Sequence, residues 1–256
     1  MKRFISILLA FILILSCAAC GKKIEEKIGY TSEASEEVYK NEYKDSNGDV
    51  SSTLEYHYPV LKGLSEDVSN AINDTFKEKI ADKEHGLEIN VDNVTAYIKN
   101  LNLEGPQVTI VEFEEYYVDD YVASFIMKER TGTNPDEVEP IYEGISFSLS
   151  TGEQLSVSRL ALPEKDEETN SLIEERIISE ANLSYSSNTT AISEETEENI
   201  RTFYDGDNFV TNGYNLAFVY NYSDISNGEK SGIYICDVDV SDMGEYIICP
   251  ADYGQS

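Results

Sequence analysis

The segment LEYHYPVLKGLSEDVSNAINDTF, residues 54–76, changes its hydrophobic period halfway along, and this change decides the fold class. Its first half alternates apolar and polar side chains, as a half-buried strand does, and it ends at a proline and a glycine. In its second half Ser65 is a suitable N-cap, and Val68, Ile72 and Phe76 recur every four residues. The segment therefore predicts a strand, a turn and an amphipathic helix that packs one stripe on a core.

Turn and helix-end signals flank this segment on both sides. Upstream, Asn47-Gly48 separates two alternating runs and predicts a β-hairpin, because both residue types tolerate a positive φ. Downstream, the four-residue period continues to Ile80, and His85-Gly86 marks a helix end. Apolar residues from Val91 to Leu101 predict a second, shorter helix, which Gly105-Pro106 ends.

Beyond residue 106 the hydrophobic period changes to two, which is typical of strands. The predicted elements are strands at 107–118, 121–130 and 141–157, helices at 166–181 and 193–204, a hairpin at 208–223 about Asn212-Gly213, a strand at 232–240 and a short helix at 241–247. Strands and helices thus alternate without a regular βαβ repeat. This order predicts an α+β fold of antiparallel sheets with helices packed on one face, in two sub-domains, 37–105 and 106–256.

The chain also resembles a known extracytoplasmic module, the paired DUF4163/DUF3298 module. In the opening segment the resemblance rests on the strand with Tyr58-Pro59, the turn glycine Gly63 and the helix carrying Ile72-Asn73. In the second half it rests on FSLSTGEQLSVSRL, YNLAFVYNYS and GIYICDVDVSDM, which are similar to the companion domain's strands, turns and short helix. The resemblance extends over roughly Val38 to Ile248.

Proteins with this paired module include lysozyme-sensing anti-sigma factors, some peptidoglycan deacetylases and stand-alone lipoproteins. The resemblance implies a non-catalytic binding module for a protein or cell-wall ligand, with a cationic protein such as lysozyme among the candidates. The chain departs from the family's motifs in two loops, TGTNPDE (131–137) and YSDISNGEKSG (222–232). We therefore place the candidate ligand-binding residues in these loops: Tyr222, Thr131, Asn134 and Lys230.

The N-terminus is similar to a bacterial lipoprotein signal peptide. A short basic start precedes a short apolar run and several small residues, and the run falls short of the about 20 residues that a spanning helix needs. Cys20, between Ala19 and Gly21, fits the lipidated cysteine, and Cys17 is the alternative. We expect residues 1–19 to be the signal peptide and residues 20–36 a flexible tether. The protein would then be lipid-anchored at the outer face of the bacterial cell membrane.

The charge of the chain is strongly negative. Its 49 acidic and 19 basic residues give a formal net charge of −30 at pH 7. Such a balance argues against binding nucleic acid, whose phosphates need lysine and arginine. The charge can serve solvation alone, or it can steer a cationic partner toward the surface.

Recognisable catalytic machinery is absent from the sequence. The two histidines, His57 and His85, occupy a predicted strand and a predicted helix end, and His57 is expected to pack or face solvent rather than to bind metal. The DSNGD loop starts like a calcium loop at Asp45, but Val50 stands where such a loop needs glycine. We expect no catalytic residue, cofactor or metal site. The alternative is a cell-wall-active hydrolase or deacetylase with an unrecognised site.

Two cysteines, Cys236 and Cys249, lie near the C-terminus. Outside the cytoplasm an even pair predicts a disulfide, which would close a small loop. The alternative is two buried thiols, and the sequence cannot supply the Cα separation that a bridge requires.

Overall fold

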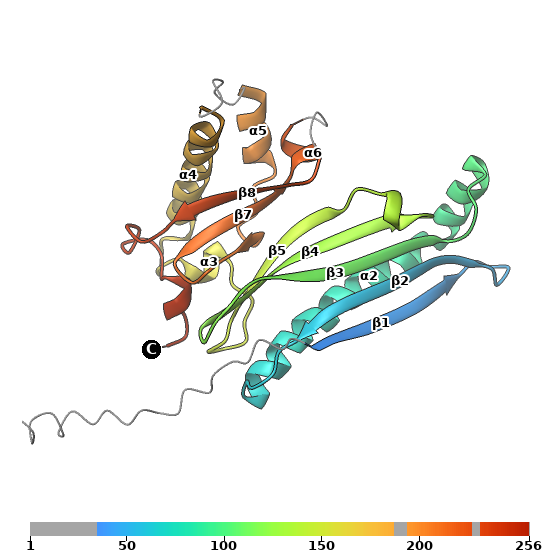
Figure 1. The fold of residues 1–256 in the computed structure, drawn as a ribbon, viewed down its shortest axis with the longest axis horizontal. Coiled ribbons are helices and arrows are strands. Elements are labelled where there is room, and N and C mark those ends of the chain that lie inside the picture. Colours follow the sequence, from blue (N-terminus) through green and yellow to red (C-terminus); the bar gives the residue numbers. More distant parts are fainter. Residues whose placement is uncertain (1–34, 187–193, 227–230, 256) are drawn as a thin grey trace, which may run out of the picture.

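The computed structural model describes residues 35–186, 194–226 and 231–255. The expected signal peptide, almost all of the expected tether, both candidate lipidation cysteines and Lys230 therefore lie outside the described residues. Within them the chain forms two sheets with helices, in agreement with the α+β class expected from the sequence (Figure 1).

The first sheet has five strands in the order β1-β2-β3-β4-β5. Its neighbouring strands are antiparallel except for β2 and β3, which run parallel because a long helix returns the chain to the end where β2 began. The expectation of purely antiparallel sheets was therefore wrong for this one pair. The strands are β1 (Ser35–Lys44), β2 (Val50–Val60), β3 (Gln107–Val118), β4 (Val122–Gly132) and β5 (Ile141–Ser148).

The connection between β2 and β3 is one helix, α2 (Glu66–Leu101), and not the two helices expected. Ser65 caps it as predicted, since its hydroxyl accepts from the amide of Val68 at 3.4 Å. The helix continues through Gly86 and ends at Asn102, which has a left-handed φ of 50°. Leu87 and Val91 pack against the sheet core just after Gly86, and this packing outweighs the weak helix propensity of glycine.

The core of this half lies between α2 and one face of the sheet (Figure 1). Phe76 of α2 is fully buried and meets Phe113 of β3 and Phe147 of β5 at ring-centroid distances of 5.1 and 5.5 Å. Leu54 and Tyr56 of β2 are also fully buried. The apolar residues of α2 that were predicted from their four-residue spacing are therefore the residues that pack against the sheet.

The second sheet is a small antiparallel one with the order β6-β7-β8. A core of aliphatic and aromatic side chains joins it to the helices, and α4 packs on β8 (Figure 1). The expected terminal helix at 241–247 is instead a series of turns about Met243. The elements are α3 (Val157–Leu160), α4 (Asp166–Ser186), α5 (Glu194–Thr202), β6 (Phe209–Val210), β7 (Asn215–Asn221), α6 (Tyr222–Ile225), β8 (Ile233–Asp239), and two 3₁₀ turns, η1 (Pro135–Glu137) and η2 (Pro250–Asp252).

The two sheets meet along β5 through side-chain hydrogen bonds. The amide of Tyr142 donates to Asn221 Oδ1 and that of Gly144 donates to Asn208 Oδ1, both at 2.7 Å. A Cβ at Gly144 would lie 2.7 Å from the carbonyl carbon of Phe209, so this approach needs glycine. The sequence predicted a sub-domain boundary after residue 105, which lies between α2 and β3 and so within the chain segment that forms the first sheet. The first sheet ends with β5, and the second begins with β6.

Candidate functional site

An open hollow of about 380 Å³ lies between the C-terminal turns of α2 and the loop that follows β4. We call it the end hollow. It is lined on the helix side by Tyr97 and Ile98, and on the loop side by Thr131, Asn134 and Val138. Its wall thus combines apolar side chains with hydroxyl and amide groups, the mixture that binding sites use.

The helix side of the end hollow exists because α2 is longer than the core it covers. The buried residues of α2 are all in its first half, Val68 to Ile80. In the second half Tyr97 and Leu101 are each 55% exposed, and Figure 1 shows these last turns extending past the strands. Val138 and Ile141, which border the loop, are 36% and 60% exposed. Of these residues Tyr97 and Val138 line the end hollow together, and exposed apolar side chains that share a hollow commonly mark an interaction surface.

The loop side is held in shape by short-range contacts. A Cβ at Gly132 would lie 2.8 Å from Val138 Cγ2, so the absence of a side chain lets the loop fold back. The guanidinium of Arg130 pairs with Glu112 and lies 3.7 Å from Asp136 Oδ1. Thr131 Oγ1 lies 3.1 Å from Thr109 Oγ1, which ties the start of the loop to β3.

The structure brings together two of the four residues that the sequence suggested for ligand binding. Thr131 and Asn134 both line the end hollow. Tyr222 does not, because it starts α6 and packs its ring 5.5 Å from that of Tyr234 against the core of the second sheet. The loop containing Tyr222 nevertheless returns close by, since the amide of Gly232 donates to the carboxylate of Glu139.

The residues of the end hollow that sequence reasoning missed are the apolar ones, Tyr97, Ile98 and Val138. The first two were assigned to the packing stripe of a helix, because a stripe has the same spacing whether or not something covers it. The available signal was the length of the stripe, which exceeds what the predicted strands could bury.

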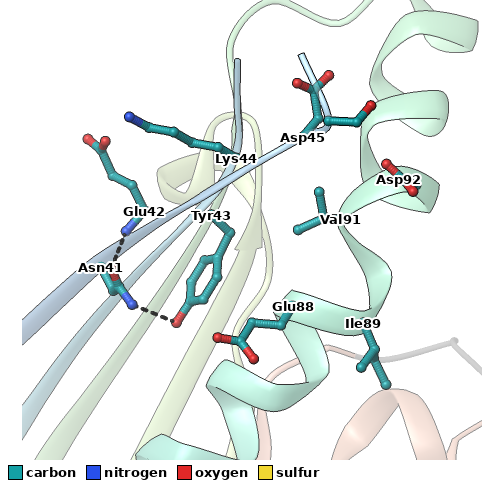
Figure 2. A pocket seen from close by; sticks show the side chains of 10 residues that line it. Asn41, Glu42, Tyr43, Lys44, Asp45, Glu88, Ile89, Val91 and Asp92 are labelled. Carbon is teal, nitrogen blue, oxygen red and sulfur yellow. Dashed lines mark hydrogen bonds between the residues drawn. The ribbon is translucent and has the colours of Figure 1, made fainter. Parts of the chain in front are cut away.

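A second, acidic hollow of about 500 Å³ separates the end of β1 from α2 (Figure 2). Glu88 of α2 projects toward Tyr43 of β1, while Lys44 extends away from the helix. Asp45 in this hollow is a turn residue, because its Oδ1 accepts from the amides of Asn47 and Asp49 at 2.9 and 3.0 Å. Burial opposes ionisation of Asp45, but these backbone donors leave its pKa lowered. No group of three or more potential metal ligands occurs among the described residues.

The predicted disulfide between Cys236 and Cys249 is not formed, and both cysteines are free thiols. Cys236 is buried on β8 beside the carbonyl of Ile177, whereas Cys249 Sγ donates to the carbonyl of Gly213 at 2.8 Å. Cys236 pairs with Phe218, five residues further along the hairpin than Gly213. At about 3.3 Å per strand residue, this separation exceeds the Cα limit of roughly 7 Å for a bridge.

Comparison with known proteins supports the fold and leaves the function open. No family model matches the sequence, and no curated protein matches it. The structure is similar to that of a DUF3298 family protein from Pseudomonas aeruginosa PAO1, with 10% identity, a TM-score of 0.50, and coverage of 85% of this chain and 96% of that one. A DUF3298 family member from Bacteroides fragilis NCTC 9343 matches at 11% identity and a TM-score of 0.48, over 85% of this chain and 95% of that one.

The likeness to the Pseudomonas protein supports a DUF3298-like fold for this α+β chain. The DUF3298 part of the resemblance seen in the sequence is thus supported at the level of fold, and the pairing with DUF4163 stays a prediction. Among the described residues, none of the helices has the length and apolar character needed to span a bilayer.

Proposed function

We propose that this chain is a membrane-anchored, extracytoplasmic lipoprotein whose domain is a non-catalytic binding module for a protein or cell-wall ligand. The observation that carries the proposal is the end hollow, in which exposed apolar side chains surround hydroxyl and amide groups at one end of the sheet. Among these side chains Tyr97 is of the type that contributes most to binding energy when a partner covers it, because tyrosine is enriched among such residues.

The charge around the end hollow favours a cationic protein among the possible ligands. Glu104, Asp136 and Glu137 are exposed at its border, and the whole chain carries −30. A negative field raises the association rate of a positive partner, but it does not select one. Selection would come from the apolar side chains beside these carboxylates, as in interfaces with an apolar centre and a polar rim.

The position of the end hollow agrees with a chain tethered at its N-terminus. The described chain enters the sheet at Ser35, and the end hollow lies at the opposite end, near Gln107 and Gly132. The eight residue-to-residue steps from Ser35 to Tyr43 span about 26 Å of strand at about 3.3 Å each. Lipid attachment at Cys20, with Cys17 as the alternative, would therefore leave the end hollow accessible.

The test is isothermal titration calorimetry of the full chain in detergent with a lysozyme as the cationic probe, at about 0.15 M salt, where charges more than roughly 8 Å apart are screened. We expect binding that Tyr97→Ala weakens about 10-fold, since truncating a central aromatic residue typically costs more than 1 kcal/mol. Tyr214→Ala is the matched control, because this tyrosine is 64% exposed at the far turn of the second sheet. It should change the affinity less than about 2-fold.

Sedimentation with purified peptidoglycan, using the same two variants, tests the cell-wall ligand. Binding there in place of lysozyme, with the same loss in Tyr97→Ala, would identify the wall as the ligand. Binding of lysozyme that disappears by about 0.15 M salt, or that both variants weaken equally, would indicate a nonspecific polyanion. Failure to bind either probe would contradict the proposed function.

A further inference from the structure

The imidazole of His57 on β2 is held between two carboxylates at the end of the sheet where β1 begins. Its Nδ1 lies 2.5 Å from Oε1 of Glu36 on β1, and its Nε2 lies 2.8 Å from Oε1 of Glu55 on β2. An ionised carboxylate can only accept a hydrogen bond, and both ring nitrogens donate only in the imidazolium form. The arrangement therefore suits a protonated His57, whose side chain is 20% exposed.

The groups around His57 are mostly acidic. Besides Glu36 and Glu55, two carboxylates of β3, Glu112 and Glu115, line the same small hollow of about 240 Å³. Two cations offset this charge: Lys40 of β1 binds Glu55 Oε2 at 2.7 Å, and Arg130 of β4 pairs with Glu112. This hollow exists because the β2–β3 pairing ends at Tyr56 and Val111, beyond which the two strands are no longer paired.

This environment favours the proton on His57. Burial of the ring lowers its pKa, but the hydrogen bonds and charges of Glu55 and Glu36 raise it by more, so that the pKa of His57 lies above its ordinary value. A group whose pKa is raised on folding stabilises the structure fully below its unfolded pKa, about 6.5 for histidine. That contribution is lost as the pH rises through the folded pKa.

The strand that His57 holds is the one through which the chain enters the domain. β1 is the edge strand of the sheet, and Glu36 is its second residue. Its buried apolar residue, Tyr43, lies at the other end of the strand, whereas Val38 beside His57 is 55% exposed. The start of β1 therefore depends on its ladder with β2 and on polar side-chain contacts, of which the Glu36–His57 pair is the first.

We propose that Glu36, His57 and Glu55 form a proton-operated clasp, which fixes the first residues of β1 to the sheet at acidic pH and releases them as the pH rises. Release of residues 35–38 would free up to about 13 Å of extended chain, at about 3.3 Å per residue. It would also uncover the small hollow beside β3. This device is independent of the end hollow, which lies at the opposite end of the sheet.

The clasp is tested by hydrogen exchange with mass spectrometry on the full chain at pH 5.5 and pH 8.5, corrected for intrinsic exchange rates. We expect protection of the peptide covering 35–40 to fall several-fold between the two pH values, because the clasp stabilises the strand only while the ring of His57 is protonated. His57→Gln should remove this pH dependence. His85→Gln is the matched control, because it removes the other histidine, which is exposed on α2, and it should behave as the unmodified chain.

An equal pH dependence in His57→Gln and in the unmodified chain would overturn the proposal. So would an imidazole NMR titration that gives His57 a pKa at or below about 6.5, with its signals assigned by comparison with His85→Gln. The NMR titration uses the unmodified His57 side chain, so it decides the question even if His57→Gln fails to fold.

Discussion

At the scale of single residues, Glu84 connects α2 to the edge strand. Its Oε1 accepts three hydrogen bonds, from the hydroxyl of Tyr39 at 2.5 Å, the side-chain amide of Asn41 at 2.8 Å and the hydroxyl of Tyr43 at 2.9 Å. The hydrogen bond from Tyr39 is the main reason that the pKa of Glu84 is lowered. Charge-assisted bonds of this kind are stronger than neutral ones, so the ionised form of Glu84 favours the folded state.

Glu84→Gln should therefore lower the free energy of unfolding at pH 7 by about 1–2 kcal/mol. Because the folded pKa of Glu84 is depressed, its contribution is complete above its unfolded pKa and is lost as the pH falls through the folded value. The difference between the two proteins should thus shrink from pH 7 to pH 3. Urea unfolding at both pH values measures it, with the exposed Glu78→Gln of the same helix as control. A difference that grows on acidification would show that the hydrogen bonds do not favour the ionised form.

At the scale of elements, α2 is the helix whose continuity the sequence pattern did not predict. The structure places Gly86 inside it, with no atom within 4 Å of a Cβ built there. Glycine in a helix interior costs about 1 kcal/mol relative to alanine, so the position is a weak point at mid-helix. Leu87 and Val91 hold the helix to the sheet beyond it.

Gly86→Ala should therefore raise the free energy of unfolding by about 0.5–1 kcal/mol, measured by urea denaturation. Gly152→Ala is the contrasting control, since its φ is +79° and its Cβ would lie 2.6 Å from the carbonyl oxygen of Val68. That variant should be destabilised. A destabilised Gly86→Ala would mean that the helix ends near this residue, as the sequence pattern first suggested.

The elements also show which parts of the fold are encoded locally. The hairpin turns at Gly48 and Gly213 have φ of +87° and +95°, and each was predicted from an Asn-Gly pair, because turn chemistry is local. The parallel pairing of β2 with β3 was not predicted, since it depends on where a 36-residue helix returns the chain. The end hollow was likewise predicted only in part. The sequence identified Thr131 and Asn134, but it did not predict the exposure of Tyr97, because this exposure depends on the length of the sheet under the helix.

At the scale of the whole molecule, the geometry separates the point of chain entry from the end hollow. Ser35 begins β1 at one end of the first sheet, and Gly132 ends β4 at the other. A chain tethered through residues before Ser35 would present the end hollow toward the surroundings and keep the His57 clasp next to the tether. Attachment to the membrane and exposure of the binding surface are then compatible in one orientation.

Attachment itself is predicted to occur through Cys20. In cells that express the chain, Cys20→Ala should move the protein from the membrane fraction to the soluble extracytoplasmic fraction and abolish labelling by a clickable palmitate analogue. The physical reason is that two acyl chains on one cysteine bury enough CH₂ groups for stable attachment, at about 0.8 kcal/mol each. Cys17→Ala is the matched control and should keep both the label and the membrane location. The reverse pattern would assign lipidation to Cys17, and a label that persists when both cysteines are replaced would show that the acyl group is attached at another residue.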